Sequence, residues 1–288
     1  MQIIEETEIM KRSKYQTITL LLLVTCAFGF VSKAQQFKPN TEVGILLGAS
    51  YYLGDLNTTH FYQPLPAVGL IIRKNIDKRF AYKAEAMFIN LQSDERKSED
   101  TISINRSLHF RSPVYELSGQ LEFNFLPYHP GNPLYTWTPF IYTGISIFNY
   151  NPQAENANGE WVDLQELGTE GQGTTTYPNR KKYPLIQFAI PMGGGFKIAV
   201  NESFNIILEY GARKTFTDYL DDVSTTFVGG NVTAYPSDMD PIAIYMSDPT
   251  KRYKKDDQRG NPEKNDWYSF AGVTLSFKLN NKTKGCDY

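Results

Sequence analysis

The chain has 288 residues, a formal net charge of −2 and an aromatic content of 14%, and its mean hydropathy is −0.40. The near-neutral charge and the lack of a Lys/Arg stripe exclude the basic footprint of a nucleic-acid-binding protein. No run of about 20 apolar residues occurs, which excludes a membrane-spanning helix. Strands that cross an outer membrane escape such a search, because half of their residues are polar.

Residues 1–34 are predicted to be a secretory signal peptide. Positions 11, 12 and 14 are basic, an apolar run covers 18–31, and Ser32-Lys33-Ala34 precedes a predicted cleavage before Gln35. The first nine residues carry three glutamates, which do not suit the basic start of a signal. We therefore expect the true start to be Met10.

Cleavage would remove Cys26 and leave Cys286 as the one cysteine of the mature chain. An unpaired cysteine in an oxidising compartment suggests a disulfide to a partner or a reactive thiol. A tail thiol without a role is the alternative. Cys286 is therefore the candidate residue for partner binding or a disulfide.

Eight stretches place an apolar side chain at every second position, as in a sheet with one apolar and one polar face. The predicted strands are 42–54, 65–76, 80–92, 114–126, 139–150, 185–200, 204–216 and 267–279. No amphipathic helix is available to cover the apolar face, and a barrel in an outer membrane needs none, because lipid covers it. The predicted fold class is all-β, an eight-stranded antiparallel transmembrane β-barrel over residues 35–279.

The connections alternate between short and long. Those at 77–79, 127–138 and 201–203 are short or moderate, whereas 55–64, 93–113, 151–184 and 217–266 are long. Bacterial barrels keep short turns in the periplasm and long loops outside. This predicts a location in the cell outer membrane, with a periplasmic C-terminal tail at 280–288.

One stretch leaves the strand count open. Residues 224–228 and 231–235 flank Gly229-Gly230 and resemble a hairpin. Each arm is shorter than the 9–11 residues that a spanning strand needs. We interpret it as a hairpin above the membrane, with a ten-stranded barrel as the alternative.

The two parities of the predicted strands carry different residues. One parity gathers the predicted lipid face: Val68, Leu70, Ile72, Ile141, Ile145, Ile147, Phe188, Ile190, Ile198, Phe204, Ile206, Leu208, Tyr210, Val273, Leu275, Phe277 and Leu279. The other parity gathers a predicted lumen charge network: Arg73, Lys83, Lys197 and Arg213 with Glu85, Glu116, Glu122 and Glu209. Eight strands enclose only enough space for side chains, and an unpaired buried charge is costly. We expect these charges to pair, which disfavours a general diffusion pore.

The histidines give little support for catalysis. His60 and His109 fall in predicted outer loops, where they could meet near Asp55, and His129 falls in a predicted periplasmic turn. A general base needs an oriented partner and a nucleophile within reach, and no spacing here predicts one. The chain is expected to be no enzyme, with no catalytic or cofactor-binding residue and no cofactor.

Charged clusters in the loops are predicted to be solvated rather than to bind ions. Asp221-Asp222 and the pair Asp238 and Asp240 lack the regular ligand spacing of a calcium loop. The basic run at 251–255 is followed at once by Asp256-Asp257, so a mixed-charge loop is favoured over a contact to lipopolysaccharide phosphates. No metal site is predicted.

Three segments carry a resemblance to a known family. They are SYYLGDLN at 50–57, TDYLDDVS at 217–224, and RGNP at 259–262 with NDWYSF at 265–270. With a signal that ends in Ala-Gln, the chain resembles the PorG-type outer-membrane barrels of the Bacteroidetes type IX secretion system. The resemblance spans essentially the whole mature chain and carries over no active-site residue.

The resemblance implies an outer-membrane component that docks a periplasmic ring, which is built from a lipoprotein and its partner. That machine exports proteins with a C-terminal sorting signal and supports motility in gliding species. Because a filled barrel is no export conduit, we expect an anchoring role, with outer-membrane lipids and the ring as partners. The alternatives are a stand-alone envelope barrel, such as an adhesin or a membrane-stabilising protein, and a narrow solute channel.

Overall fold

The structure is a computed structural model that describes residues 39–230 and 234–279. The predicted signal peptide, the predicted tail with Cys286, and the start of the second arm of the predicted hairpin lie outside the described residues. Among the described residues, no helix is long and apolar enough to cross a membrane.

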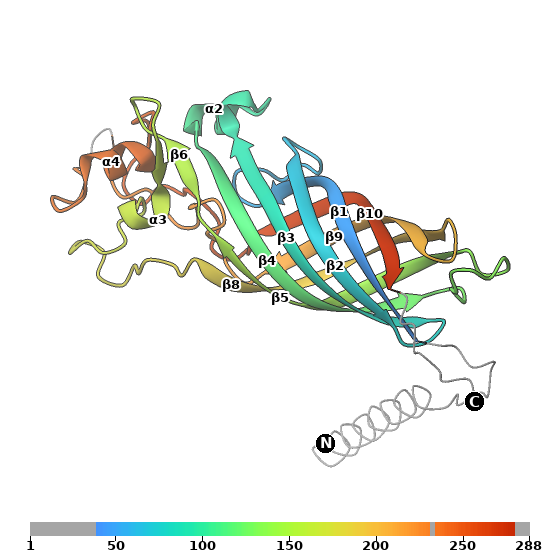
Figure 1. Ribbon diagram of the computed structural model, residues 1–288. Helices are drawn as coiled ribbons and strands as arrows, with labels where there is room; N and C mark the ends of the chain where they lie inside the picture. The colour runs from blue at the N-terminus through green and yellow to red at the C-terminus, as the bar shows by residue number, and fades with distance from the viewer. Residues whose placement is uncertain (1–38, 231–233, 280–288) are drawn as a thin grey trace, which may run out of the picture. The chain divides into compact units, whose positions relative to one another are not determined.

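Eight antiparallel strands close into a barrel, which confirms the predicted fold class. They are β1 (Asn40–Leu53), β2 (Leu65–Asn75), β3 (Phe80–Asp94), β4 (His109–Asn124), β5 (Trp137–Tyr150), β8 (Ile186–Ala199), β9 (Phe204–Thr215) and β10 (Trp267–Leu279). Each strand pairs with the next along the chain, and β10 pairs with β1 to close the circle (Figure 1). The seam runs from Thr41 opposite Leu279 to Leu53 opposite Trp267.

The ten-stranded barrel is wrong. The two additional strands, β6 (Gln153–Glu155) and β7 (Trp161–Asp163), come from the connection at 151–184 and extend β4 outside the barrel. The first arm of the predicted hairpin, 224–228, forms no strand. It lies instead against 256–259, where Thr226 bridges Gln258 and the Phe227 N–H donates to the Asp257 carbonyl.

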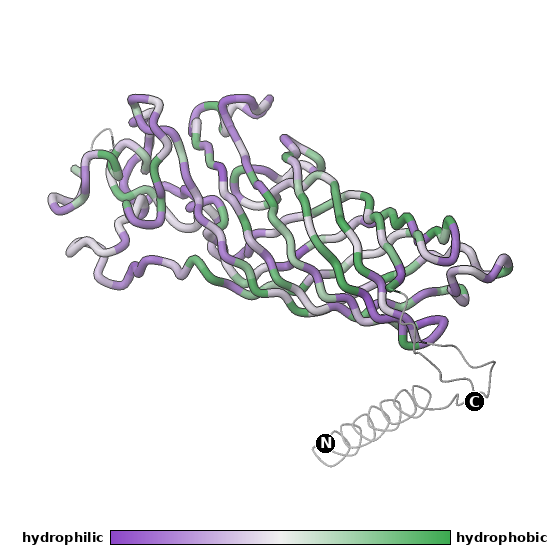
Figure 2. Tube along the Cα trace, viewed as in Figure 1, coloured by the Kyte–Doolittle hydropathy of each residue, from purple (hydrophilic) through white to green (hydrophobic). Residues whose placement is uncertain are grey.

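Burial alternates along the strands with the predicted parity. In β2, Leu70 is 64% exposed whereas its neighbour Ile71 is 2% exposed. Exposed apolar side chains recur on all eight strands, among them Ile45, Ile72, Tyr82, Leu117, Ile145, Phe188, Leu208 and Phe277. Figure 2 shows the resulting hydrophobic stretches along the barrel strands. An outward apolar band of this kind matches a barrel whose outer face is covered by lipid.

Two tight turns are stabilised by the same pattern of side-chain to backbone hydrogen bonds. Asp77 Oδ1 accepts from the Arg79 and Phe80 N–H groups, and Asn201 Oδ1 accepts from the Ser203 and Phe204 N–H groups. Asp and Asn favour such turns because their short side chains satisfy the backbone two and three residues on. The composition at 77–79 and 201–203 therefore sets where β2 turns into β3 and β8 into β9.

Strand β4 begins at His109, five residues before the expected start. The β3–β4 ladder continues from Asn90 opposite Pro113 to Asp94 opposite His109, whereas pairing with β5 ends at Val114. A proline is tolerated in a strand where a neighbour is missing. Pro113 therefore lies within the strand and does not mark its beginning.

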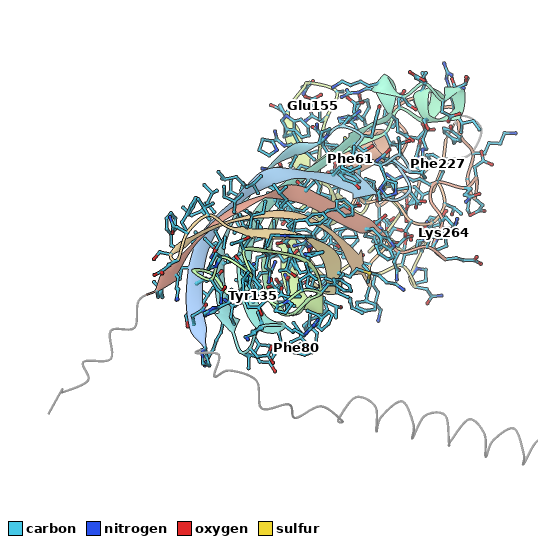
Figure 3. The ribbon with its side chains drawn as sticks, turned by 90° about the vertical axis from the view of Figure 1, so that its right-hand side faces the viewer. Phe61, Phe80, Tyr135, Glu155, Phe227 and Lys264 are labelled. Carbon is cyan, nitrogen blue, oxygen red and sulfur yellow. The ribbon has the colours of Figure 1, made fainter. Side chains whose placement is uncertain are left out.

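The long connections gather at one end of the barrel and form a folded cap over it (Figure 1). The cap contains η1 (Glu95–Lys97), α2 (Thr101–Arg106), α3 (Leu164–Leu167) and α4 (Pro241–Ser247). Figure 3 shows Glu155, Phe227 and Lys264 at this end, and Phe80 and Tyr135 at the end with the short connections. The cap shares a hydrophobic cluster with the strand ends: Leu56, Leu108, Leu164, Leu220, Val223 and Met246 pack with Tyr52, Phe110, Tyr150 and Tyr268.

Candidate functional site: a filled lumen under a buried polar cap

All eight charged residues of the predicted lumen network point into the barrel. Each of them is at most 4% exposed. The strands deliver them from different sides of the barrel: β2 carries Arg73, β3 carries Lys83 and Glu85, β4 carries Glu116 and Glu122, β8 carries Lys197, and β9 carries Glu209 and Arg213. Because the inward parity of a strand is fixed by the apolar face that it turns to lipid, no other arrangement of these side chains is compatible with the outward band.

Ion pairs connect these residues into two linked groups. Towards the short connections, Arg73 Nε lies 2.7 Å from Glu122 Oε2, and Lys197 also pairs with Glu122. Towards the cap, Arg213 Nη2 lies 2.9 Å from Glu85 Oε1 and Arg213 Nε lies 3.2 Å from Glu116 Oε2.

Lys83 joins the two groups. Its Nζ lies 2.9 Å from Glu85 Oε2 in one group and 3.9 Å from Glu122 Oε1 in the other, and it also lies 2.8 Å from Glu209 Oε1. The ammonium group also lies over the Tyr142 ring, 4.5 Å from its centroid. Every cation of the network therefore contacts at least one carboxylate, which is the condition under which buried charges are tolerated.

Sequence reasoning missed one member of the network, Glu42. It is 1% exposed, and its Oε2 lies 3.2 Å from Arg73 Nη1. Asn75 Nδ2 donates to Glu42 Oε1 and Ser276 Oγ donates to Oε2. Glu42 has the same parity as Gly44 and Gly48, so the alternation of the first strand contained the signal that would have identified it.

A close approach inside the barrel requires glycine at position 211. A Cβ atom there would lie 1.8 Å from Tyr142 Oη and 2.9 Å from Arg213 Nη1. Any larger residue would displace both side chains. The lumen is thus packed around its ion pairs, and its side chains fill the space that a channel would need.

The three segments that carry the family resemblance meet in the cap. Tyr52, from SYYLGDLN, places its Oη 2.6 Å from Asp221 Oδ2 of TDYLDDVS and 2.8 Å from Asp266 Oδ1 of NDWYSF. The Leu220 N–H donates to Asp266 Oδ2, and the Asn261 N–H donates to Asp55 Oδ2. Sequence reasoning did not predict this convergence, because the first segment lies at the end of β1 and the other two lie at opposite ends of the long connection between β9 and β10.

Tyr52 has one phenolic proton for two carboxyl groups. Both short contacts are hydrogen bonds only when one of the carboxyls, Asp221 or Asp266, is itself protonated. Burial raises the pKa of both carboxyls well above the ordinary value. Gly54 makes room for this triad, because a Cβ there would lie 1.8 Å from Asp266 Oδ1.

A second buried polar cluster of the cap surrounds Arg259, which is 2% exposed. Its Nη1 lies 3.0 Å from Glu170 Oε1 and donates to the Asp222 carbonyl at 2.6 Å. Glu170 also accepts the backbone N–H groups of Ser224 and Thr225. Glu170 was not singled out from the sequence, and the acidic composition of 151–184 gives no sign of its burial.

The cap holds carboxyls that burial keeps partly protonated. Burial raises the pKa of Asp218 to about 8, with the nearby Asp55 adding to the effect and a hydrogen bond with Ser224 opposing it. Burial raises the pKa of Asp222 to about 6, although the charge of Arg259 opposes the shift. A protonated carboxyl group carries no charge and needs no cation beside it. The cap can therefore bury more acidic than basic side chains.

The histidine constellation considered from the sequence does not assemble. His60 Nδ1 lies 2.9 Å from Tyr51 Oη, whereas His109 Nε2 accepts the Glu155 N–H and its ring lies edge-on to Trp161. The two rings thus have separate partners. His129 lies in the connection between β4 and β5, at the other end of the barrel.

The acidic pairs have hydrogen-bond partners within the chain. Asp222 accepts from Thr169 and Tyr183, Asp238 accepts the Thr175 N–H, and Asp240 caps α4 through the Ile242 N–H. Within 39–230 and 234–279, no group of three or more His, Cys, Asp or Glu side chains is arranged to hold a metal ion. The basic run contributes local contacts, such as Lys255 over the Tyr177 ring.

The comparisons with known proteins identify a family and a set of similar barrels. The profile of a family described as "Domain of unknown function (DUF6089)" matches residues 17–231, well over half of the chain. No curated protein matches the chain.

Similar solved structures are outer-membrane barrels of low sequence identity. The N-terminal β-barrel domain of Pseudomonas aeruginosa OprF is 11% identical over 84% of this chain and 100% of that chain, with a TM-score of 0.38. The attachment invasion locus protein Ail of Yersinia pestis, in complex with sucrose octasulfate, is 7% identical with the same coverage and a TM-score of 0.40. Neisserial surface protein A is 7% identical, also over 84% and 100%, with a TM-score of 0.41. The fold rests on the strand pairings themselves.

Proposed function

The chain belongs to the DUF6089 family, and we propose that it is a non-conducting, non-enzymatic outer-membrane anchor that docks the periplasmic ring of a type IX-like protein secretion machine. The observation that carries the proposal is the filled lumen, in which each of four buried cations contacts a carboxylate. A barrel packed in this way offers no passage to an exported protein, so its contribution to export would be anchorage.

The orientation follows from the connections. Bacterial outer-membrane barrels keep their short turns in the periplasm. In this orientation the tight turns at Asp77 and Asn201 and the connection at 125–136 face the ring. The predicted tail at 280–288 follows β10 on the same side. Cys286, outside the described residues, stays the candidate for a disulfide to the lipoprotein or its partner.

The segments that carry the resemblance give further support. Tyr52, Asp221 and Asp266 come from all three segments and form one buried cluster of the cap, as expected if the family shares a structural requirement there. That requirement concerns the stability of the barrel mouth. A shared requirement of this kind is compatible with a role in assembly.

An affinity pull-down of the tagged barrel from detergent-solubilised envelopes tests the anchor. We expect two periplasmic ring components to co-purify, one of them a lipoprotein. Comparison with and without reductant, and with a Cys286→Ser variant, tests the disulfide separately. Recovery of the barrel without any ring component would overturn the anchoring role.

The second candidate is a stand-alone envelope barrel, such as an adhesin, and the ordered cap favours it. Removing the whole connection at 151–184 would not separate the candidates, because Glu170 and Tyr183 hold the cap together. Shortening the exposed β6–β7 turn at 157–160 separates the two candidates better, because these residues are exposed. An adhesin should lose surface binding, whereas an anchor should keep protein export unchanged.

The third candidate, a narrow solute channel, is tested in planar bilayers. We expect no steady conductance from the wild-type barrel. A stepwise current that persists at neutral pH would contradict both the anchor and the filled lumen on which it rests.

A further inference from the structure

Two hollows lie in line on the outer face of the barrel, along β2, β3 and β4. The lower hollow has a volume of about 700 Å³, and its lining includes Val68, Leu70, Ala86, Tyr115 and Leu117. The upper hollow, nearer the cap, has a volume of about 460 Å³, and its lining includes Pro66, Asn90, Arg111, Pro113 and Trp161. The lower hollow is apolar, whereas the upper one has a basic and polar rim.

The strand register places the two hollows one after the other along the same strands, and we call the two together the groove. Ala86 lies opposite Leu117, Phe88 opposite Tyr115, and Asn90 opposite Pro113. The rings of Phe88 and Tyr115, whose centroids are 5.1 Å apart, lie between the two hollows.

The length of this groove matches a membrane leaflet. Six residues of β4 separate Leu117 from Arg111, which corresponds to about 20 Å along a strand. One leaflet of membrane hydrocarbon is about 15 Å thick. In a membrane-embedded barrel, the lower hollow would therefore face hydrocarbon, and the upper one would lie at the level of the lipid headgroups.

Arg111 is the charge that the upper hollow presents. Its guanidinium lies over the Trp161 ring, 3.7 Å from the centroid, and its Nε donates to Gln153 Oε1. Among the described residues Arg111 forms no ion pair, because the neighbouring Glu155 pairs with Arg96. Its Nη1 and Nη2 groups make no hydrogen bond within the described chain. A guanidinium held in this way is suited to bidentate contact with a phosphate.

We propose that the groove binds one phosphate-bearing lipid of the leaflet at the cap end, with an acyl chain in the lower hollow and the phosphate on Arg111. Charge complementarity selects the headgroup, and the apolar lining selects the chain. Trp161 holds the guanidinium in place through a cation–π contact. The proposal needs only a membrane-embedded barrel and is independent of the anchoring role.

The test uses the intact barrel in a maltoside detergent, with native mass spectrometry to count bound molecules. The probes are didecanoyl phosphatidic acid, didecanoyl phosphatidylcholine and inorganic phosphate. We expect phosphatidic acid to bind about tenfold more tightly than phosphatidylcholine, and inorganic phosphate neither to bind nor to compete. Equal binding of the two lipids would overturn the proposal, as would displacement of phosphatidic acid by inorganic phosphate.

Variants separate the two halves of the groove. Arg111→Ala should abolish the preference for phosphatidic acid, whereas Ala86→Trp, an outward-facing change that fills the lower hollow, should weaken both lipids. Lys214→Ala is the matched control, since Lys214 on β9 is an exposed cation that lies over the ring of Trp267 on β10. Two results would overturn the proposal: an equal loss in Lys214→Ala, or a dimer of the barrel that Ala86→Trp abolishes.

Discussion

The lumen and the cap bury charged side chains in opposite ways. In the lumen, four cations meet five carboxylates, and the contacts are ion pairs such as Arg73 with Glu122. In the described part of the cap, Arg259 is buried and Arg106 is half-buried, and the carboxyl side chains around them are those of Asp55, Glu95, Glu170, Asp218, Asp221, Asp222 and Asp266. There, hydroxyls, backbone N–H groups and bound protons take the place of cations.

The difference shows two solutions to the same desolvation cost. A charge in this lumen is buried among other side chains, and few backbone groups are free to bind it, since the strand N–H groups are used in the ladders. It therefore needs an opposite charge. The cap is made of irregular backbone, which offers unpaired N–H groups to carboxylates. The stability of the lumen should thus depend on the balance of its charges, and the stability of the cap should depend on pH.

Breaking the charge balance of the lumen should give the largest effect. Glu122→Gln leaves Arg73 and Lys197 with one less charge to pair with, so we expect the free energy of unfolding to fall by about 3–5 kcal/mol. Urea unfolding of the barrel in detergent measures it. The control is Glu263→Gln, in an exposed part of the connection between β9 and β10. A loss no larger than that of the control would show that the lumen charges do not depend on their partners.

Destabilising the cap should leave the barrel folded. Arg259→Met removes hydrogen bonds to Glu170 and to the Asp222 carbonyl, and contacts of this kind contribute about 1.5–3 kcal/mol each. We expect faster proteolysis within 217–266 and faster hydrogen exchange at the Ser224 and Thr225 amides. Exchange in β1 to β5 should not change. Loss of the whole barrel would contradict the separation of lumen and cap.

The pH dependence of the cap has a definite sign. The pKa of Asp218 in the folded cap is about 8 and that of Asp222 is about 6, both above the value of an unfolded aspartate. Between pH 4 and pH 8 the folded cap binds more protons, so its stability decreases as the pH rises. Proteolysis of the cap should be slower at pH 5.5 than at pH 8. Asp218→Asn should reduce that difference, and an unchanged pH profile would contradict the assignment.

The smallest effect is expected at Glu42, the surplus acid of the lumen. Glu42→Gln makes the count of lumen charges equal and keeps a hydrogen-bond acceptor for Asn75, while Arg73 retains Glu122. We expect a change in the free energy of unfolding below about 1.5 kcal/mol, measured as for Glu122→Gln. A loss as large as that of Glu122→Gln would mean that local geometry outweighs charge balance.

The strands were predictable because two constraints agree. A spanning strand must alternate, and Asx residues such as Asp77 and Asn201 fix the turns, so the strand ends fall within a few residues of those expected. The exception, His109, follows from a sheet that continues beyond the band of exposed apolar side chains, where that band no longer imposes a pattern. The inward positions of Arg73 and Glu122 follow from the same alternation.

The cap was not predictable for a related reason. Its contacts join Tyr52, Asp221 and Asp266, which have no periodic relation along the chain. Only the distant pairing of β1 with β10 brings them together. The acidic pair at 221–222 was expected to be solvated, whereas the structure buries both residues and binds them to two tyrosines, Tyr52 and Tyr183, and to Thr169.

The β1–β10 seam has a consequence for biogenesis. The two edges that must meet are almost the full length of the mature polypeptide apart, so joining them carries the greatest loop-closure entropy of any pairing in the fold. Asp266 directly precedes the last strand and reaches the tyrosine at the end of the first. Closing the barrel therefore also brings Asp266 to Tyr52, and a chain cut short before β10 would have neither the seam nor this contact of the cap.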